Sequence, residues 1–306
     1  MLHTFQVAET GEQLPRWQQS GIYDYDTFDK LLGMLPANKN EIFRKAKLLE
    51  ARVVKMETRG IHVPGDCKTL RDAVALVEWN TVRGKYANYT NKETLFRIPL
   101  FGSTLYRPAR FSTIVMGKGN HQIAGDYLRI ASAMNIVGDP GVPKNEIVVE
   151  GGIYFKEGIP GNCHLQHLTL RQAEECGVYA FSCFTMKDVL VEQCGYHGVW
   201  ASGTGVVGRC TNMEVRECGW SGVVASNGGS ITLIGAKTKV HHNCTKGDSD
   251  FMGLKVFGLK VFGASSTIQL VSPLTKEQVA LDNSGGGNWG ANWSANINQI
   301  KTMVSQ

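Results

Sequence analysis

The sequence predicts an all-β protein built from short strands and tight turns, and three observations lead to this fold class. Glycine is frequent, with 35 among 306 residues, against a typical share of roughly 7%. Proline is scarce, with 9 residues, and the glycines follow no collagen triplet. From Ser112 onward, short apolar runs alternate with Gly, Asn and Asp, and no helical period is seen. Many short strands joined by tight turns fit this pattern.

The region before Ser112 has a helical pattern instead. A short helix around Phe28 and a second at about 40–57 precede the strand-like IHVP, and Thr69 caps a third helix at about 69–80. Residues 81–111 are irregular and rich in aromatic and basic residues, so an inserted loop is expected there. We therefore divide the chain into a helical segment (1–60), a strand-rich region (61–272) and a C-terminal capping tail (273–306).

Three segments of the strand-rich region align without gaps: LRQAEECGV (170–178), VEQCGYHGV (191–199) and VRECGWSGV (215–223). VHHN (240–243) matches their opening. The first column holds Leu170, Val191, Val215 and Val240, at spacings of 21, 24 and 25 residues (191−170, 215−191, 240−215). Such a period, with several short strands per repeat, predicts the coils of a parallel β-helix, in which each coil contacts only its neighbours.

Stacked coils place equivalent residues in columns, and each column has its own character. The column of Leu170 is expected to point inward. Three positions later come small residues at a corner, which are Ala173, Cys194, Cys218 and Asn243. The column between them alternates in charge, as strands about 4.8 Å apart favour, and is expected to face outward; it holds Arg171, Glu192, Arg216 and His241.

These repeats resemble the right-handed parallel β-helix superfamily, the pectate-lyase-like fold that includes the NosD-like repeat proteins. The opening TLRDAVALVEW, followed by TIVMGKGNHQI and YLRIASAMNIVGDPG, is similar to that family as well. The resemblance covers about residues 61–272. It implies a right-handed single-stranded parallel β-helix with a helical N-terminal cap at about 69–80. HLTLRQAEECGV and ITLIGAKTKVHHNCT also resemble β-helix proteins of unicellular algae and of large DNA viruses of protists, which implies a cellular or viral assembly.

Enzymes of this fold commonly act on acidic polysaccharides with clustered carboxylates, but the acidic residues here share no column. Glu192 is instead flanked by Arg171 and Arg216, which indicates charge pairing. His241 and His242, with Cys244, Asp248 and Asp250 nearby, have the atom types of a metal site. Because neighbours on a strand point to opposite faces, we expect no metal there. His164 and His167, near Cys163, are three positions apart, so their side chains would also point to opposite faces of a strand, and we expect no site there. No catalytic residue and no cofactor are predicted.

The cysteines are predicted to be packing residues. No CxxC pair occurs among the eight, so a structural zinc site is not expected. Cys194 and Cys218 are predicted to be buried free thiols at a corner. Cys176 shares a column with His197 and Ser221, a pairing that we interpret as packing rather than nucleophilic catalysis.

Aromatic residues give the candidate binding site. Tyr196 and Trp220 share a column after the corner, and Trp200 and His197 lie on the same coil as Tyr196. We predict that they form an exposed strip that holds a glycan or a partner surface. The predicted function is therefore a rigid, non-catalytic structural or interaction protein. The alternative is a polysaccharide-active lyase, hydrolase or epimerase, which rests on fold analogy alone.

The charge and the hydropathy of the chain limit the classes of partner that we expect. The net charge of +5 is mild and its basic residues are dispersed, so nucleic acid is not expected. No apolar stretch reaches the roughly 18 residues of a membrane span. The N-terminus lacks the pattern of a signal peptide, which predicts an intracellular protein with reduced thiols. The apolar stripe at about 40–57 predicts packing on the β-helix or an assembly role, with a protein partner or in a homo-oligomer.

Overall fold

The structure is a computed structural model, and it describes residue 56 and residues 59–87 and 112–303. The chain separates into two units, each described by itself. The first comprises Met1–Lys68 and Asp72–Phe111, and the second comprises Thr69–Arg71 and Ser112–Gln306. The expected helices before residue 56, and most of the expected inserted loop, lie outside the described residues.

Helix α4 (Leu70–Ala87) follows the short strand β1 (Ile61–Val63). Its apolar stripe is buried at Leu70, Ala73, Val74 and Val77, as the helical period predicts. The helix continues through residue 87, so residues 81–87 are not part of a loop. The mixture of aromatic and basic residues, with the poor helix former Gly84 among them, hid the continuation. In the described residues, no helix has the length and apolar character needed to cross a membrane.

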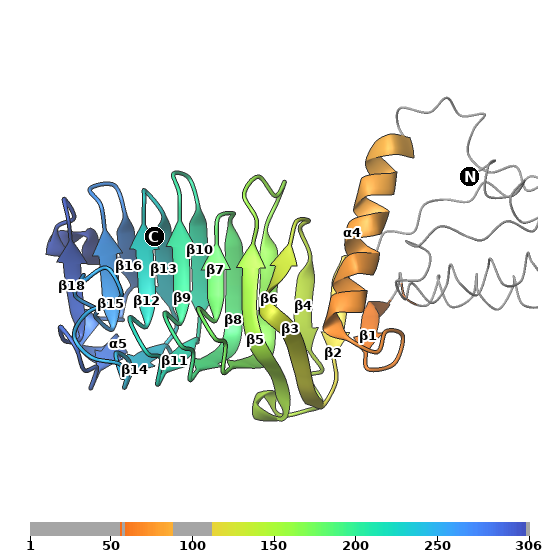
Figure 1. Ribbon diagram of the computed structural model, residues 1–306, viewed down its shortest axis with the longest axis horizontal. Coiled ribbons are helices and arrows are strands. Elements are labelled where there is room, and N and C mark those ends of the chain that lie inside the picture. Colours follow the sequence, from red (N-terminus) through yellow and green to blue (C-terminus); the bar gives the residue numbers. More distant parts are fainter. Residues whose placement is uncertain (1–55, 57–58, 88–111, 304–306) are drawn as a thin grey trace, which may run out of the picture. The chain divides into compact units, whose positions relative to one another are not determined.

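From Thr113 onward the apolar runs form parallel strands that stack in three ladders (Figure 1). Each coil contributes one strand, or part of a bent strand, to each ladder. Sheet 1 contains β2 (Thr113–Met116), β4 (Asn135–Gly138), the first parts of β6 (Cys163–Arg171) and β8 (Phe184–Glu192), β10 (Val207–Thr211), β13 (Ser230–Ile234), β16 (Thr267–Val271) and β19 (Ile300–Met303).

Sheets 2 and 3 complete each coil. Sheet 2 contains the first parts of β3 (Gly119–Ile130) and β5 (Ile147–Phe155), the second parts of β6 and β8, β11 (Glu214–Arg216), β14 (Lys239–His241) and β17 (Ala280–Leu281). Sheet 3 contains the ends of β3 and β5, then β7 (Val178–Ala180), β9 (Val199–Ser202), β12 (Val223–Ser226), β15 (Leu259–Phe262) and β18 (Trp289–Asn292). The remaining elements are η2 (Lys144–Glu146), α5 (Lys276–Val279) and η3 (Ile297–Gln299).

The predicted inward column is confirmed. Leu170 pairs in register with Val191, Val191 with Val215, and Val215 with Val240. All four side chains are fully buried. The protein is therefore an all-β parallel solenoid, and its core is a stack of equivalent aliphatic residues that no single coil could bury alone.

The corner after sheet 2 explains why the repeat has its sequence. From β6 onward, the residue that follows each strand of sheet 2 has a positive φ of 50–57°, which turns the chain sharply; these residues are Gln172, Gln193, Glu217, His242 and Asp282. The next side chain then points inward and fills the place beside a glycine of the preceding coil. A Cβ at Gly198 would lie 2.3 Å from Cγ1 of Val215 and 3.3 Å from Sγ of Cys218. The repeat therefore needs glycine before its valine.

The coils continue past residue 272, where the sequence pattern suggested a capping tail. Strand β17 pairs with β14, β18 with β15, and β19 with β16, all parallel. The apolar residues of this tail were expected to close the end of the solenoid. Val279 is buried and Trp289 half-buried, but Leu281, Trp293 and Ile297 are 37%, 73% and 38% exposed. The sequence concealed this coil because a Gly/Asn-rich turn replaces the repeat motif there.

Candidate ligand-binding face

The outward side of sheet 3 carries a row of aromatic rings at successive coils. Tyr154 pairs in register with Tyr179, and Tyr179 with Trp200. Tyr179 and Trp200 stack at 4.4 Å and 17°, while Tyr154 meets Tyr179 edge to face at 5.5 Å. All three side chains are half-buried. We call Tyr154, Tyr179 and Trp200 the aromatic row.

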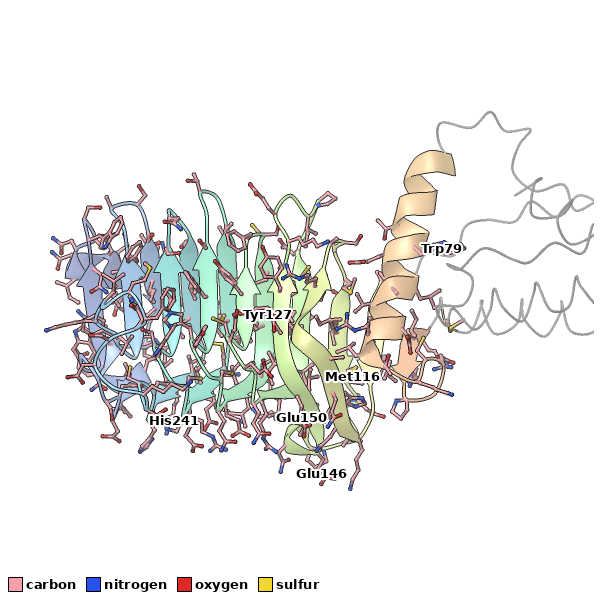
Figure 2. All side chains as sticks on the ribbon, in the orientation of Figure 1. Trp79, Met116, Tyr127, Glu146, Glu150 and His241 are labelled. Atoms are coloured by element: carbon pink, nitrogen blue, oxygen red, sulfur yellow. The ribbon has the colours of Figure 1, made fainter. Side chains whose placement is uncertain are left out.

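Neighbouring side chains hold the row in place. The guanidinium of Arg129 lies 5.0 Å from the ring centroid of Tyr154, and Phe181 packs 4.6 Å from Tyr179. Tyr127, which Figure 2 labels among the side chains of the solenoid, packs with its ring centroid 5.8 Å from that of Tyr154. Its hydroxyl accepts a hydrogen bond from the backbone N–H of Cys176 at 3.0 Å. Burial raises the pKa of Tyr127, so this phenol stays neutral.

A second group of rings lies at the corner before sheet 3. Tyr196 and Trp220 are nearly parallel, at 4.0 Å and 5°, and Phe251 lies 5.4 Å from Trp220. Tyr196 and Trp220 are therefore brought together as predicted. Trp220, however, is only 7% exposed, so the prediction of an exposed strip is wrong for this residue. The excursion formed by residues 245–257 packs on the pair, and no period in the sequence indicated that packing.

His197 joins the corner group to the aromatic row. Its ring lies 5.2 Å from Trp200 and 5.4 Å from Trp220. Its Nδ1 accepts a hydrogen bond from the backbone N–H of Ser221 at 3.1 Å. Burial, assisted by the nearby charge of Lys260, lowers the pKa of His197 to about 3. The imidazole is buried and neutral, so it supports the rings instead of lying in an exposed strip.

The aromatic row ends beyond Trp200. The next two residues in the column, Val224 and Lys260, are 2% and 3% exposed. The indole Nε1–H of Trp200 donates to Oγ of Ser226 on the next coil at 2.7 Å. Lys260 in turn forms an ion pair with Asp250 of the excursion at 3.2 Å. Burial lowers the pKa of Lys260, and the charge of Asp250 opposes that shift.

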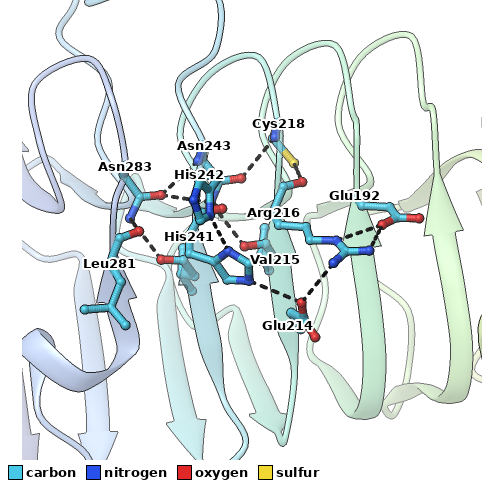
Figure 3. Close-up of polar contacts among 11 residues, drawn as sticks. Glu192, Glu214, Val215, Arg216, Cys218, His241, His242, Asn243, Leu281 and Asn283 are labelled. Atoms are coloured by element: carbon cyan, nitrogen blue, oxygen red, sulfur yellow. Dashed lines mark hydrogen bonds and ion pairs between the residues drawn. The ribbon is translucent and has the colours of Figure 1, made fainter.

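The charged column on sheet 2 pairs Arg171, Glu192 and Arg216 with alternating charge, as predicted, and Figure 3 shows its contact between Glu192 and Arg216. Glu192 accepts from Nε of Arg171 at 2.5 Å and from Nη2 of Arg216 at 2.6 Å. Although the column faces outward, Glu192 is only 2% exposed because the two arginines cover it. Burial alone would raise the pKa of Glu192, but the hydrogen bonds from Arg216 and Arg171 outweigh it, so the pKa is lowered. This carboxylate stays ionised and paired.

The expectation that His241 and His242 point to opposite faces is wrong. Their Nδ1 atoms lie 2.7 Å apart, and Nε2 of His241 lies 3.2 Å from Oε1 of Glu214. The cause is the φ of +54° at His242, which takes that residue out of the strand alternation. In the part of the chain that the structure describes, no group of three or more His, Cys, Asp or Glu side chains is arranged to hold a metal ion.

The thiols are packing groups. All eight cysteines lie in the described part of the chain and none forms a disulfide, and Cys194 and Cys218 are buried thiols as predicted. Burial raises the pKa of Cys176 to about 12. A nucleophilic cysteine needs a lowered pKa, so Cys176 beside His197 does not have the character of a catalytic pair.

Sequence reasoning missed Tyr154, Tyr179, Phe181 and Phe251. A usable signal was present for the first two. The pairs Gly152-Ile153, Gly177-Val178 and Gly198-Val199 are followed by Tyr154, Tyr179 and Trp200, so extending the alignment by one residue would have shown the row. Phe251 lies in a segment with no repeat and gave no such signal.

Comparison of the chain with family models, with curated proteins and with solved structures found no match.

Proposed function

We propose that the solenoid is a non-catalytic binding module that holds an extended glycan chain on the aromatic row. The observation that carries this proposal is the register of three half-exposed rings, Tyr154, Tyr179 and Trp200, on successive coils. A row at the coil spacing of about 4.8 Å runs along the solenoid axis. Pyranose rings of an extended chain repeat at a comparable length. Because Tyr179 and Trp200 stack on each other, the row presents ring edges outward, and the C–H groups of a sugar pack against these edges while its hydroxyls stay in water.

The electrostatics support binding rather than catalysis. A glycosidase needs one carboxyl group with a raised pKa as the acid. Glu192 is held between two arginines, and Asp188 lies between Lys144 at 2.7 Å and His167 at 2.8 Å. Burial alone would raise the pKa of Asp188, but the hydrogen bonds from Lys144 and His167 outweigh it, so the pKa is lowered. Polysaccharide-active chemistry therefore has less support than binding.

Membership of the right-handed, pectate-lyase-like superfamily is also proposed here, on the coil length and the corner motif. We also propose an intracellular location, and an assembly role for the N-terminal helices in a protein complex or homo-oligomer. A membrane or nucleic-acid partner is not proposed. The link to algal or viral assemblies rests on the sequence resemblance alone.

The test is affinity electrophoresis of the full chain through gels that contain polygalacturonate, alginate, mannan, xyloglucan or soluble cellulose derivatives. We expect retardation in at least one gel. Trp200→Ala should weaken that binding about tenfold or more, as the loss of roughly 1.4 kcal/mol of contact with the aromatic ring would. Trp200→Phe should retain most of the binding. Trp293→Ala removes an exposed indole outside the row and is the matched control. No retardation in any gel would overturn the proposal.

A further inference from the structure

We infer that the aromatic row recognises the end of a glycan chain, because the excursion formed by residues 245–257 closes one end of the row. This inference rests on the proposed function and specifies which part of the ligand is bound. It depends on three features of the described residues: the exposure along the column, the anchoring of the excursion, and the position of the charged residue at the other end.

Exposure along the column changes abruptly. Arg129 is exposed, and Tyr154, Tyr179 and Trp200 are half-exposed. Val224 and Lys260, the next residues in register, are 2% and 3% exposed. A ligand lying on the row can therefore contact the column from Arg129 to Trp200. Three coil spacings separate these residues, which gives about 14 Å and room for a short oligosaccharide.

The excursion is fixed over the closed end. Equivalent corners pass from the small residue to the next strand in five residues (Cys194 to Val199, Cys218 to Val223), whereas Asn243 to Leu259 takes sixteen. Oδ1 of Asp250 accepts from the backbone N–H groups of Met252 and Leu254, each at 3.0 Å.

The other carboxylate oxygen of Asp250 pairs with the buried Lys260, which is itself a member of the column. The loop is therefore attached to the column by an ion pair shielded from water, which is costly to break on one side only.

The open end has a different character. Arg129 lies over Tyr154, and its guanidinium is available to hydroxyl or carboxylate oxygens of a chain that continues past the row. One end of the ligand then abuts the excursion near Trp200, while the rest of the chain leaves over Arg129. A site with one closed end binds chain termini and excludes internal segments, since a continuous chain would collide with residues around Asp250.

The experiment measures how many protein molecules bind each polysaccharide chain. Size-defined fractions of the polysaccharide that gives retardation, from disaccharide to long polymer, are titrated calorimetrically into the full chain. End recognition predicts a stoichiometry fixed per chain whatever its length, and an affinity that stops rising once the oligosaccharide covers the row. Recognition of internal segments predicts that bound protein per chain grows in proportion to length, and this result would overturn the inference.

A loop variant provides the second arm. Asp250→Ala combined with Lys260→Ala removes both ends of the ion pair and so leaves no unpaired buried charge. The released loop should raise the number of protein molecules per polymer chain at least twofold. Lys255→Ala, an exposed change in the same excursion, is the matched control. An unchanged stoichiometry in a folded double variant, judged by circular dichroism, would contradict the role of the excursion as the barrier.

The two levels of failure are distinguishable. Binding that requires Trp200 but scales with chain length disproves end recognition and leaves the proposed function standing. Absence of binding to every polysaccharide disproves both.

Discussion

The side-chain amide of Asn243 donates a hydrogen bond to Oδ1 of Asn283, which occupies the same corner one coil further along, at 3.0 Å. Asn243 also accepts from the backbone N–H of Cys218 and donates to the carbonyl of Val215, each at 3.1 Å. One fully buried side chain thus connects three successive coils.

Asn243→Ala should therefore destabilise the solenoid by about 2–4 kcal/mol, because it leaves the buried N–H of Cys218 without its acceptor and removes the side-chain hydrogen bonds to Val215 and Asn283. Urea unfolding followed by circular dichroism measures the change. Lys239→Ala, an exposed change on strand β14 of the same coil, should stay within about 0.5 kcal/mol of the wild type. Equal stabilities of the two variants would contradict the bridging role of Asn243.

Gly198→Ala should cost about 1–3 kcal/mol or more. The added methyl group would lie 2.3 Å from Cγ1 of Val215 and 2.7 Å from the carbonyl oxygen of Gly222, and neither buried neighbour can withdraw freely. Gly141→Ala is the control, because its closest contact would be a side-chain oxygen of Asp139 at 3.3 Å. Thermal midpoints of the two variants decide the matter, and a Gly198→Ala protein as stable as the control would refute the close-packed corner.

His197 should make stability depend on pH. The unfolded chain binds the histidine proton near the ordinary pKa of roughly 6.5, whereas burial lowers the pKa of the folded His197 to about 3. Its contribution to stability is therefore complete above pH 6.5 and is lost progressively as the pH falls toward 3. His197→Asn keeps an acceptor for the N–H of Ser221 but does not titrate. The free energy of unfolding of the wild type should therefore fall relative to that of the variant between pH 7 and pH 4. A constant difference between the two in urea unfolding would argue against a buried neutral histidine.

Alkylation should distinguish one cysteine from the others. Cys183 is half-exposed, whereas Cys194 and Cys218 are buried. Iodoacetamide should label Cys183 in the native protein and reach the two corner thiols only after unfolding. Both are buried, and the hydrogen bond with Cys194 together with burial raises the pKa of Cys218. Peptide mapping by mass spectrometry measures each site. Rapid native labelling of Cys194 or Cys218, or a disulfide between them, would contradict their packing role.

The core was predictable because stacked coils give equivalent residues equivalent neighbours. Leu170, Val191, Val215 and Val240 each meet a copy of their own environment, so spacing alone identified the column. Features that occur once had no such redundancy. Residues 245–257 pack over Trp220 through tertiary contacts of a segment that has no repeat. His241 contacts His242 because His242 has a left-handed backbone conformation.

The candidate site was found in part for the same reason. Tyr196, His197, Trp200 and Trp220 all belong to aligned coils, and the structure brings them into one cluster. Which of these rings contact water could not be read from the alignment, because the excursion that covers Trp220 lies outside the repeat.

The parallel contact of Tyr196 with Trp220 joins two neighbouring coils at a ring separation of 4.0 Å. Two chromophores fixed in this way couple optically, and the coupling vanishes once the coils part. A solenoid can open locally, coil by coil, rather than all at once. Near-ultraviolet dichroism of this pair would therefore report the separation of one particular coil boundary, and its loss could be timed against the far-ultraviolet signal of the whole stack during unfolding.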